Sequence, residues 1–152
     1  MVRLLNCFVC AILAVGVNMD NNIQKCLTSS QQALVIIDGK HSSIENMNEL
    51  NIELDKMLLN SRLMPAFGVS IHTETLNAIN SGVWLKLQYN GTQIINEMPF
   101  DELIIEVNPE FTGFNIIRGN KGIYEGRCYY VALDNSTMQP IYQFIIDSYT
   151  VN

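Results

Sequence analysis

The sequence predicts an α+β fold, in which a mostly antiparallel sheet of about six strands has a helix before it and a C-terminal helix packed on one face. Short runs rich in β-branched and aromatic residues recur in the second half of the chain and are separated by short turns. One amphipathic helical pattern precedes these runs and another follows them. The second half contains no crossover long enough to connect parallel strands, which favours antiparallel pairing.

The length and charge of the chain limit the possible classes of function. The chain has 152 residues, enough for one domain, and a formal net charge of −6. Its nine Lys and Arg residues are scattered and form no basic stripe for phosphate contacts, so we expect no nucleic-acid partner. The sequence contains no phosphate-binding glycine loop and no nucleophile elbow. Cys7 and Cys10 are closely spaced, but Cys26 and Cys128 each lack a second metal ligand at short spacing, so we predict no cofactor and no metal site.

An apolar N-terminal segment, residues 1–18, precedes a single domain at residues 19–152. Arg3, the apolar run after it and the small residues at positions 14–16 are typical of a signal peptide that is cleaved after Gly16. The alternative is retention as a buried helix, because a single Arg is a weak positive start. Cleavage predicts a secreted or periplasmic protein, and retention predicts a cytoplasmic one. The run is too short to cross a bilayer.

The first half of the domain is expected to form one strand and one long helix. Residues 33–39 form a β-branched run that ends at the turn-forming pair Asp38-Gly39. Residues 42–45 match a capping box, in which a Ser hydroxyl and a Glu carboxylate satisfy free backbone donors at a helix start. A helix follows, because apolar residues recur at steps of three and four up to Leu58, and Pro65 ends it at the latest.

The middle and the end of the chain are expected to form most of the sheet and the last helix. We expect strands at residues 67–72, 83–89, 92–97 and 103–107, with a short helix at residues 74–80. Asn90-Gly91 predicts a two-residue hairpin turn, because both residues tolerate positive φ. The C-terminal helix begins at Ser136 or Thr137 and has Pro140 in its first turn.

A second hairpin is predicted from two strand-like runs, residues 114–118 and 123–133, which are connected through the turn at residues 119–122. Pairing the two glycines at the ends of this turn puts Ile117 opposite Tyr124. The register therefore fixes which side chains of the hairpin share a face.

This hairpin carries the predicted binding site. Its Arg and Tyr residues are of the types that anchor protein interfaces, and we predict that a protein partner contacts Arg118, Tyr124, Arg127 and Tyr129. The predicted register puts Arg118, Arg127 and Tyr129 on one face and Tyr124 on the other, toward the core. The alternative is an ordinary solvated surface, on which Arg127 pairs with Glu125 or Glu106 across the strands.

The cysteines and the missing motifs leave several functions open. Cys26 and Cys128 are candidates for a disulfide if the chain is exported, and are buried apolar residues otherwise. Absence of a catalytic motif favours a non-enzymatic protein-binding module, acting as an inhibitor, accessory subunit or adaptor through the hairpin. The alternatives are a secreted or periplasmic ligand-binding domain, and a small hydrolase that uses His72 and scattered carboxylates.

Overall fold

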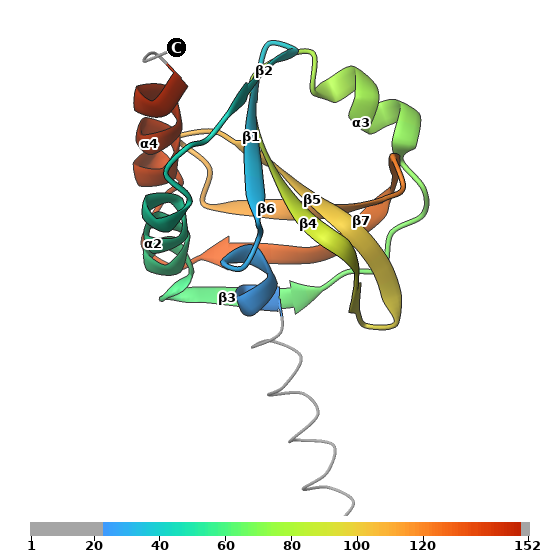
Figure 1. Ribbon diagram of the computed structural model, residues 1–152. Coiled ribbons are helices and arrows are strands. Elements are labelled where there is room, and N and C mark those ends of the chain that lie inside the picture. Colours follow the sequence, from blue (N-terminus) through green and yellow to red (C-terminus); the bar gives the residue numbers. More distant parts are fainter. Residues whose placement is uncertain (1–22, 150–152) are drawn as a thin grey trace, which may run out of the picture.

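A seven-stranded antiparallel sheet forms the centre of the protein in the computed structural model, which describes residues 23–149 (Figure 1). The strands are β1 (Gln32–Ile37), β2 (Lys40–Ser43), β3 (Ser61–Pro65), β4 (Val83–Ile95), β5 (Met98–Val107), β6 (Gly113–Asn120) and β7 (Ile123–Leu133). The helices are α2 (Met47–Leu58), α3 (His72–Ala78) and α4 (Gln139–Tyr149), and residues 23–27 form a further helical turn. The predicted α+β class is confirmed. The N-terminal segment at residues 1–18, and with it the question of cleavage, lies outside the described residues.

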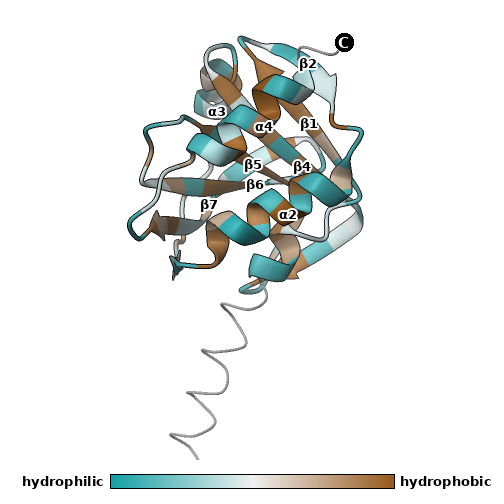
Figure 2. Cartoon of the chain, turned by 90° about the vertical axis from the view of Figure 1, so that its left-hand side faces the viewer, coloured by the Kyte–Doolittle hydropathy of each residue, from teal (hydrophilic) through white to brown (hydrophobic). Residues whose placement is uncertain are grey.

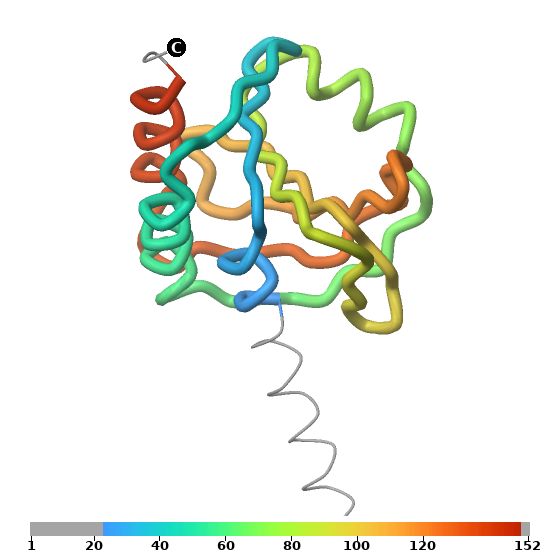
Figure 3. Tube along the Cα trace, in the orientation of Figure 1, coloured from blue at the N-terminus to red at the C-terminus, as the bar shows by residue number. Residues whose placement is uncertain are grey.

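The sheet consists of a central meander with one strand pair and one single strand added at its edges. Strands β4 to β7 follow one another in the chain, and each pairs with the next. Figure 3 shows the two long-range pairings, with the blue β1 beside the yellow-green β4 and the green β3 beside the orange-red β7. The order across the sheet is therefore β2-β1-β4-β5-β6-β7-β3.

One face of the sheet carries the main hydrophobic core beneath α2 and α4 (Figures 1 and 2). Helix α2 buries Leu50, Leu54 and Leu58 against it, and α4 buries Ile141 and Ile145. These positions recur at steps of three and four, so each helix presents one apolar stripe to the sheet. Burial of each such side chain contributes roughly 1.5–3 kcal/mol, which makes this face the main source of stability.

The opposite face carries a smaller apolar cluster beneath α3. It is built from Ile36, Trp84, Ile104 and Ile117 of the sheet, with Ile79 at the end of the helix. Helix α3 has seven residues and buries only one of them, Thr75, so it covers this face incompletely. In residues 23–149 there is no helix of the length and hydrophobicity that a membrane span requires.

The predicted capping box at residues 42–45 is wrong, because these residues overlap strand β2. Asp38 and Gly39 have positive φ angles of 47° and 77° and turn the chain directly back to pair β2 with β1. Asn46 caps α2 instead, and its side-chain oxygen accepts a hydrogen bond of 3.1 Å from the Glu49 backbone N–H. Three residues, 44–46, therefore separate the end of β2 from the start of α2.

The predicted turn at Asn90-Gly91 is also wrong. Strand β4 runs on past this pair, and the hairpin closes at Asn96 and Glu97, whose φ angles are 48° and 64°. The longer hairpin buries Ile95 and Phe100 in the main core. Tertiary packing therefore selects a turn sequence that is locally less favourable than Asn-Gly.

The predicted strand at residues 67–72 is wrong, whereas both later helices are confirmed. The strand in this region is β3, which ends at Pro65. The irregular chain that follows continues along β7, and the Gly68 backbone N–H donates to the Arg127 carbonyl oxygen at 3.1 Å. At the start of α4 the Thr137 hydroxyl oxygen accepts from the Gln139 backbone N–H, in agreement with the predicted start.

Candidate functional site

The β6–β7 hairpin, where the binding site was predicted, has a different register from the one expected. Its turn consists of Lys121 and Gly122, with φ angles of 51° and 81°. Gly119 consequently pairs with Tyr124, and the predicted pairing of Ile117 with Tyr124 is wrong. The observed turn is one residue further along the chain than the expected turn at Asn120-Lys121, because a two-residue hairpin turn favours a glycine at a central position with positive φ.

Two β-bulges in β7, one on each side of Arg127, decide where this residue lies. Gly119 pairs with Tyr124 and Arg118 with Gly126, which leaves Glu125 as an extra residue on β7. Ile117 pairs with Arg127 and Ile116 with Tyr129, which leaves Cys128 as a second extra residue. A bulge reverses the alternation of side chains beyond it. Arg127 therefore shares the α3 face with Ile117, while Arg118, the next residue along β6, lies on the opposite face.

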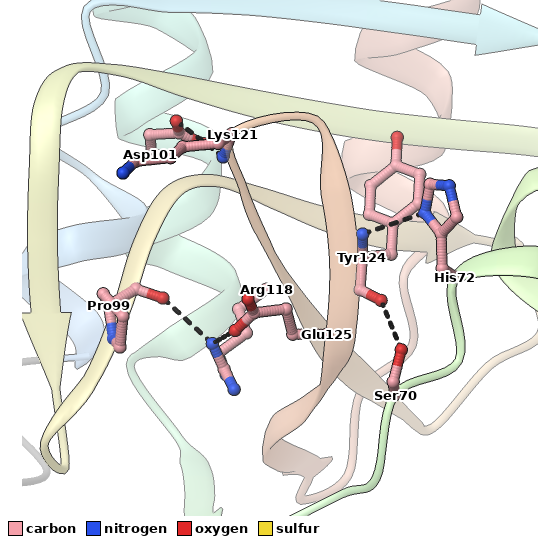
Figure 4. Close-up of polar contacts among 8 residues, drawn as sticks. All are labelled: Ser70, His72, Pro99, Asp101, Arg118, Lys121, Tyr124 and Glu125. Carbon is pink, nitrogen blue, oxygen red and sulfur yellow. Dashed lines mark hydrogen bonds and ion pairs between the residues drawn. The ribbon is translucent and has the colours of Figure 1, made fainter.

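Of the four residues predicted to contact a partner, Arg127 is exposed and the other three are engaged within the fold. Tyr124 is 3% exposed and Tyr129 is 0% exposed. The Arg118 guanidinium forms an ion pair with Glu125 and donates to the Pro99 carbonyl oxygen at 2.9 Å (Figure 4). The hairpin thus presents one of its two arginines to a ligand. A partner-binding role for all four residues stays a prediction.

A pocket of about 360 Å³ lies between α3 and the sheet, and Arg127 is part of its wall. The lining residues from α3 and its N-cap are Ile71, Glu74, Thr75 and Ala78, and those from the sheet and the β5–β6 connection are Trp84, Glu106, Phe111, Gly113, Phe114, Asn115, Ile117 and Arg127. Pockets that bind small molecules start at roughly this volume and combine apolar walls with a few polar groups. This pocket has both properties.

The register of the sheet fixes the arrangement of the pocket floor. Trp84 on β4 lies directly opposite Glu106 on β5, so their side chains are neighbours on the α3 face. The Trp84 indole N–H donates to the Ser81 carbonyl oxygen at 3.0 Å, which fixes the orientation of the ring. Arg127 stands at the other side of the floor, because β6 separates β5 from β7.

Thr75 is the one buried polar residue of α3, and its hydroxyl group has no hydrogen-bond partner. The residue is 3% exposed and lines the pocket. A helical Thr commonly donates to the carbonyl four residues earlier, but here only the Thr75 backbone N–H contacts the Ile71 carbonyl oxygen. A buried hydroxyl without a partner costs roughly 1–3 kcal/mol. A polar group in the pocket would remove this cost.

Two glycines allow the chain to pass close to Arg127. Gly126 has a φ of 144°, and a Cβ atom at this position would lie 2.7 Å from the Val69 carbonyl oxygen. A Cβ atom on Gly68 would lie 2.8 Å from the Arg127 backbone nitrogen. Side chains are excluded at both positions, because real Cβ contacts are longer. The irregular chain after β3 therefore lies directly against the bulged part of β7 and supports Arg127.

His72, the predicted base of a hydrolase, has a structural role instead. Its Nδ1 accepts a hydrogen bond of 3.1 Å from the Tyr124 backbone N–H, and the two rings have centroids 5.9 Å apart (Figure 4). His72 does not line the pocket beneath α3. The contact anchors the first turn of α3 to β7, so His72 holds the pocket roof in place.

The scattered carboxylates considered for hydrolysis are engaged elsewhere, with one exception. Asp101 accepts from the Lys121 backbone N–H, and Asp134 pairs with Arg62 at 3.1 Å. Glu106 is the exception, because it lines the pocket. Within the part of the chain that the structure describes, no group of three or more His, Cys, Asp or Glu side chains is placed to hold a metal ion.

The cysteines considered for a disulfide both carry free thiols in the structure. Burial raises the pKa of the Cys128 thiol to about 12 and also raises the pKa of Cys26. Tyr89 lies nearby, donates to the Cys26 carbonyl oxygen at 2.5 Å and has a pKa that burial raises well above its ordinary value. These groups belong to the main core and its border, away from the pocket.

Sequence reasoning missed most of the pocket. Glu74, Thr75 and Asn115 gave no signal, because a Thr in a short helix or an Asn in a strand is common on any surface. Arg127 was selected for its residue type, and Glu106 only as a possible ion-pair partner. The polar Glu106 next to a buried apolar run was the available signal, since it marks a face that is not fully covered.

Comparison of the chain with protein-family models, with curated protein sequences and with solved structures finds no match. The function is therefore inferred from the geometry of the pocket.

Proposed function

We propose that this domain is a non-enzymatic binding module whose binding site is the pocket beneath α3. The observation that carries the proposal is Thr75, a fully buried hydroxyl group without a partner at a pocket that also exposes Arg127. Most buried polar groups in native proteins have a hydrogen-bond partner, and of the four buried side-chain atoms that lack one in the described residues, the Thr75 oxygen is the one that lies at this pocket. Trp84, Ile117 and Ile71 supply the apolar wall that a ligand would contact.

Trp84 provides a direct test, because it is the one tryptophan of the chain and lines the pocket. A library of small metabolites is screened for compounds that change Trp84 fluorescence and raise the melting temperature. Ala78→Phe fills the pocket from an exposed position of α3, and we expect it to abolish both responses. Leu76→Phe adds a ring on the same helix outside the pocket and is the matched control.

A compound that acts on the wild type and on Leu76→Phe, but not on Ala78→Phe, supports the proposal. The proposal is wrong if every active compound acts equally on both variants, or if none acts on the wild type.

A protein partner at the hairpin is a second candidate, favoured by the apolar residues beside Arg127. Phe67 and Val69 are 73% and 82% exposed and flank Gly68, whose backbone N–H donates a hydrogen bond to the Arg127 carbonyl oxygen. Exposed aromatic and aliphatic side chains beside an arginine are typical of protein interfaces. The double variant Phe67→Ser and Val69→Ser should then no longer bind the protein partner, whereas Ala78→Phe should still bind it. Binding of the purified partner to each variant measures this difference.

A further inference from the structure

The charged residues that line the pocket have no ion-pair partner within the described residues. Of the three arginines that the structure describes, Arg62 and Arg118 each pair with a carboxylate, whereas Arg127 does not. Glu74 and Glu106 likewise form no ion pair within residues 23–149. The pocket therefore holds both signs of charge without neutralising either internally.

The two signs of charge lie at different ends of the pocket. Glu106 is on β5 and Arg127 on β7, and the intervening strand places their backbones about 10 Å apart. Glu74 approaches from the roof, on the helix. A ligand lying across β6 would thus meet a guanidinium at one end and a carboxylate at the other.

The groups between the two ends are neutral and suit a small ligand with an apolar part. Ile117 lies on the floor beneath them, and Asn115 beside it offers a neutral amide. The Thr75 hydroxyl above them is able to donate or accept a hydrogen bond. The ring of Trp84 next to Glu106 provides an apolar surface, and its face also attracts cations.

We infer that the pocket binds a small zwitterion of the ω-amino-acid class, whose charged ends are separated by an apolar chain, with its carboxylate on Arg127 and its ammonium group on Glu106 and Glu74. This inference rests on the proposed function and names the ligand class of the same site. A guanidinium binds a carboxylate through two parallel hydrogen bonds, and ionised partners make such bonds about twice as strong as neutral ones. The lining carries one negative charge in excess, which disfavours dianions and phosphate esters.

The test titrates the full chain with unbranched ω-amino acids of increasing chain length, and with the standard amino acids for comparison, and follows Trp84 fluorescence and binding heat. The tightest binder is then compared with its amide, which lacks the carboxylate, and with its N-acetyl derivative, which lacks the ammonium group. We expect each derivative to bind at least about tenfold more weakly than the free amino acid, because each loses one charge-assisted contact. This comparison needs no variant.

Two variants test which pocket side chain binds each charged end of the ligand. Arg127→Gln should remove the preference for the free amino acid over its amide, and Glu106→Gln should remove the preference over the N-acetyl derivative. Glu45→Gln, an exposed carboxylate outside the pocket, is the matched control and should retain both preferences. Circular dichroism checks that each variant is folded.

The outcomes separate the inference from the proposed function. If the free amino acid and both derivatives bind equally, or if the preferences survive in both variants, the inference is wrong. If amino acids do not bind but another class of compound does, and Ala78→Phe blocks it, the ligand class is wrong and the binding module stands. If nothing binds in the pocket, both fail.

Discussion

The two faces of the sheet use their residues in opposite ways. The face beneath α2 and α4 is apolar and closely covered, and the Tyr89 hydroxyl at its border donates to the Cys26 carbonyl oxygen. The face beneath α3 leaves a pocket, three unpaired charges and the unsatisfied hydroxyl of Thr75. Proteins commonly give up stability at functional sites and recover it elsewhere. The first face therefore stabilises the fold, and the second has the composition of a binding surface.

The largest expected effect is on the first face. Leu54→Ala removes a side chain that is 0% exposed between α2 and the sheet, and should lower the free energy of unfolding by about 2–5 kcal/mol. Leu76→Ala makes the same chemical change on α3, where the side chain is 43% exposed, and should lower it by less than about 1 kcal/mol. Urea unfolding measures both values. Equal losses would show that the two faces stabilise the fold alike.

The second prediction concerns the pH dependence of the main core. Burial raises the pKa of the Cys128 thiol to about 12, whereas an unfolded cysteine ionises near pH 8.5. The thiol's contribution to stability is complete below this lower value, because both states then hold the proton. It decreases by about 1.4 kcal/mol per pH unit as the pH rises from roughly 9 to 12, because only the unfolded state ionises.

Unfolding of Cys128→Ala and the wild type between pH 8 and pH 11 measures this contribution. The variant should lose stability less steeply with pH than the wild type. Parallel curves would mean that the thiol ionises normally in the folded protein. Thiol labelling followed by peptide mass mapping gives an independent measurement, in which Cys26 should react before Cys128.

The sequence predicted the fold class because alternation and amphipathic spacing report burial directly. The apolar stripe of α2, the strands of the second hairpin and the C-terminal helix all follow from local patterns. The positions of the turns do not follow from local patterns. Alternative turn positions differ by little free energy, and tertiary packing decides among them. Closing the first long hairpin at Asn96 buries Ile95 and Phe100, which outweighs the local preference of Asn90-Gly91.

The candidate site was less predictable, because it depends on an inserted residue. Without the bulge at Glu125, simple alternation keeps Arg127 on the same face as Arg118, as predicted from the sequence. With the bulge, Arg127 lies in the pocket and Arg118 pairs with Glu125 on the other face. Gly126, beside the bulge, was the available signal, because an isolated glycine inside a strand pattern indicates a bulge.

A third prediction tests the start of the helix that covers the main core. Asn46→Ala removes the side-chain oxygen that accepts from Glu49, and should lower the free energy of unfolding by about 1 kcal/mol. Ser43→Ala, at an exposed position of β2, is the matched control and should change it by less than about 0.5 kcal/mol. A loss for Asn46→Ala no larger than that of the control would mean that Asn46 does not cap α2.

The smallest expected effect is the most informative about the α3 face, because its sign differs from the others. Thr75→Val replaces a buried hydroxyl without a partner by a methyl group of similar size, and should raise the free energy of unfolding by up to about 1 kcal/mol. The same variant should bind the pocket's ligand more weakly, since the ligand loses a hydrogen-bond partner. A stability gain with unchanged binding would make Thr75 an imperfection of packing. A stability loss would mean that the hydroxyl already has a partner in the free protein, and the main support for a ligand site beneath α3 would be gone.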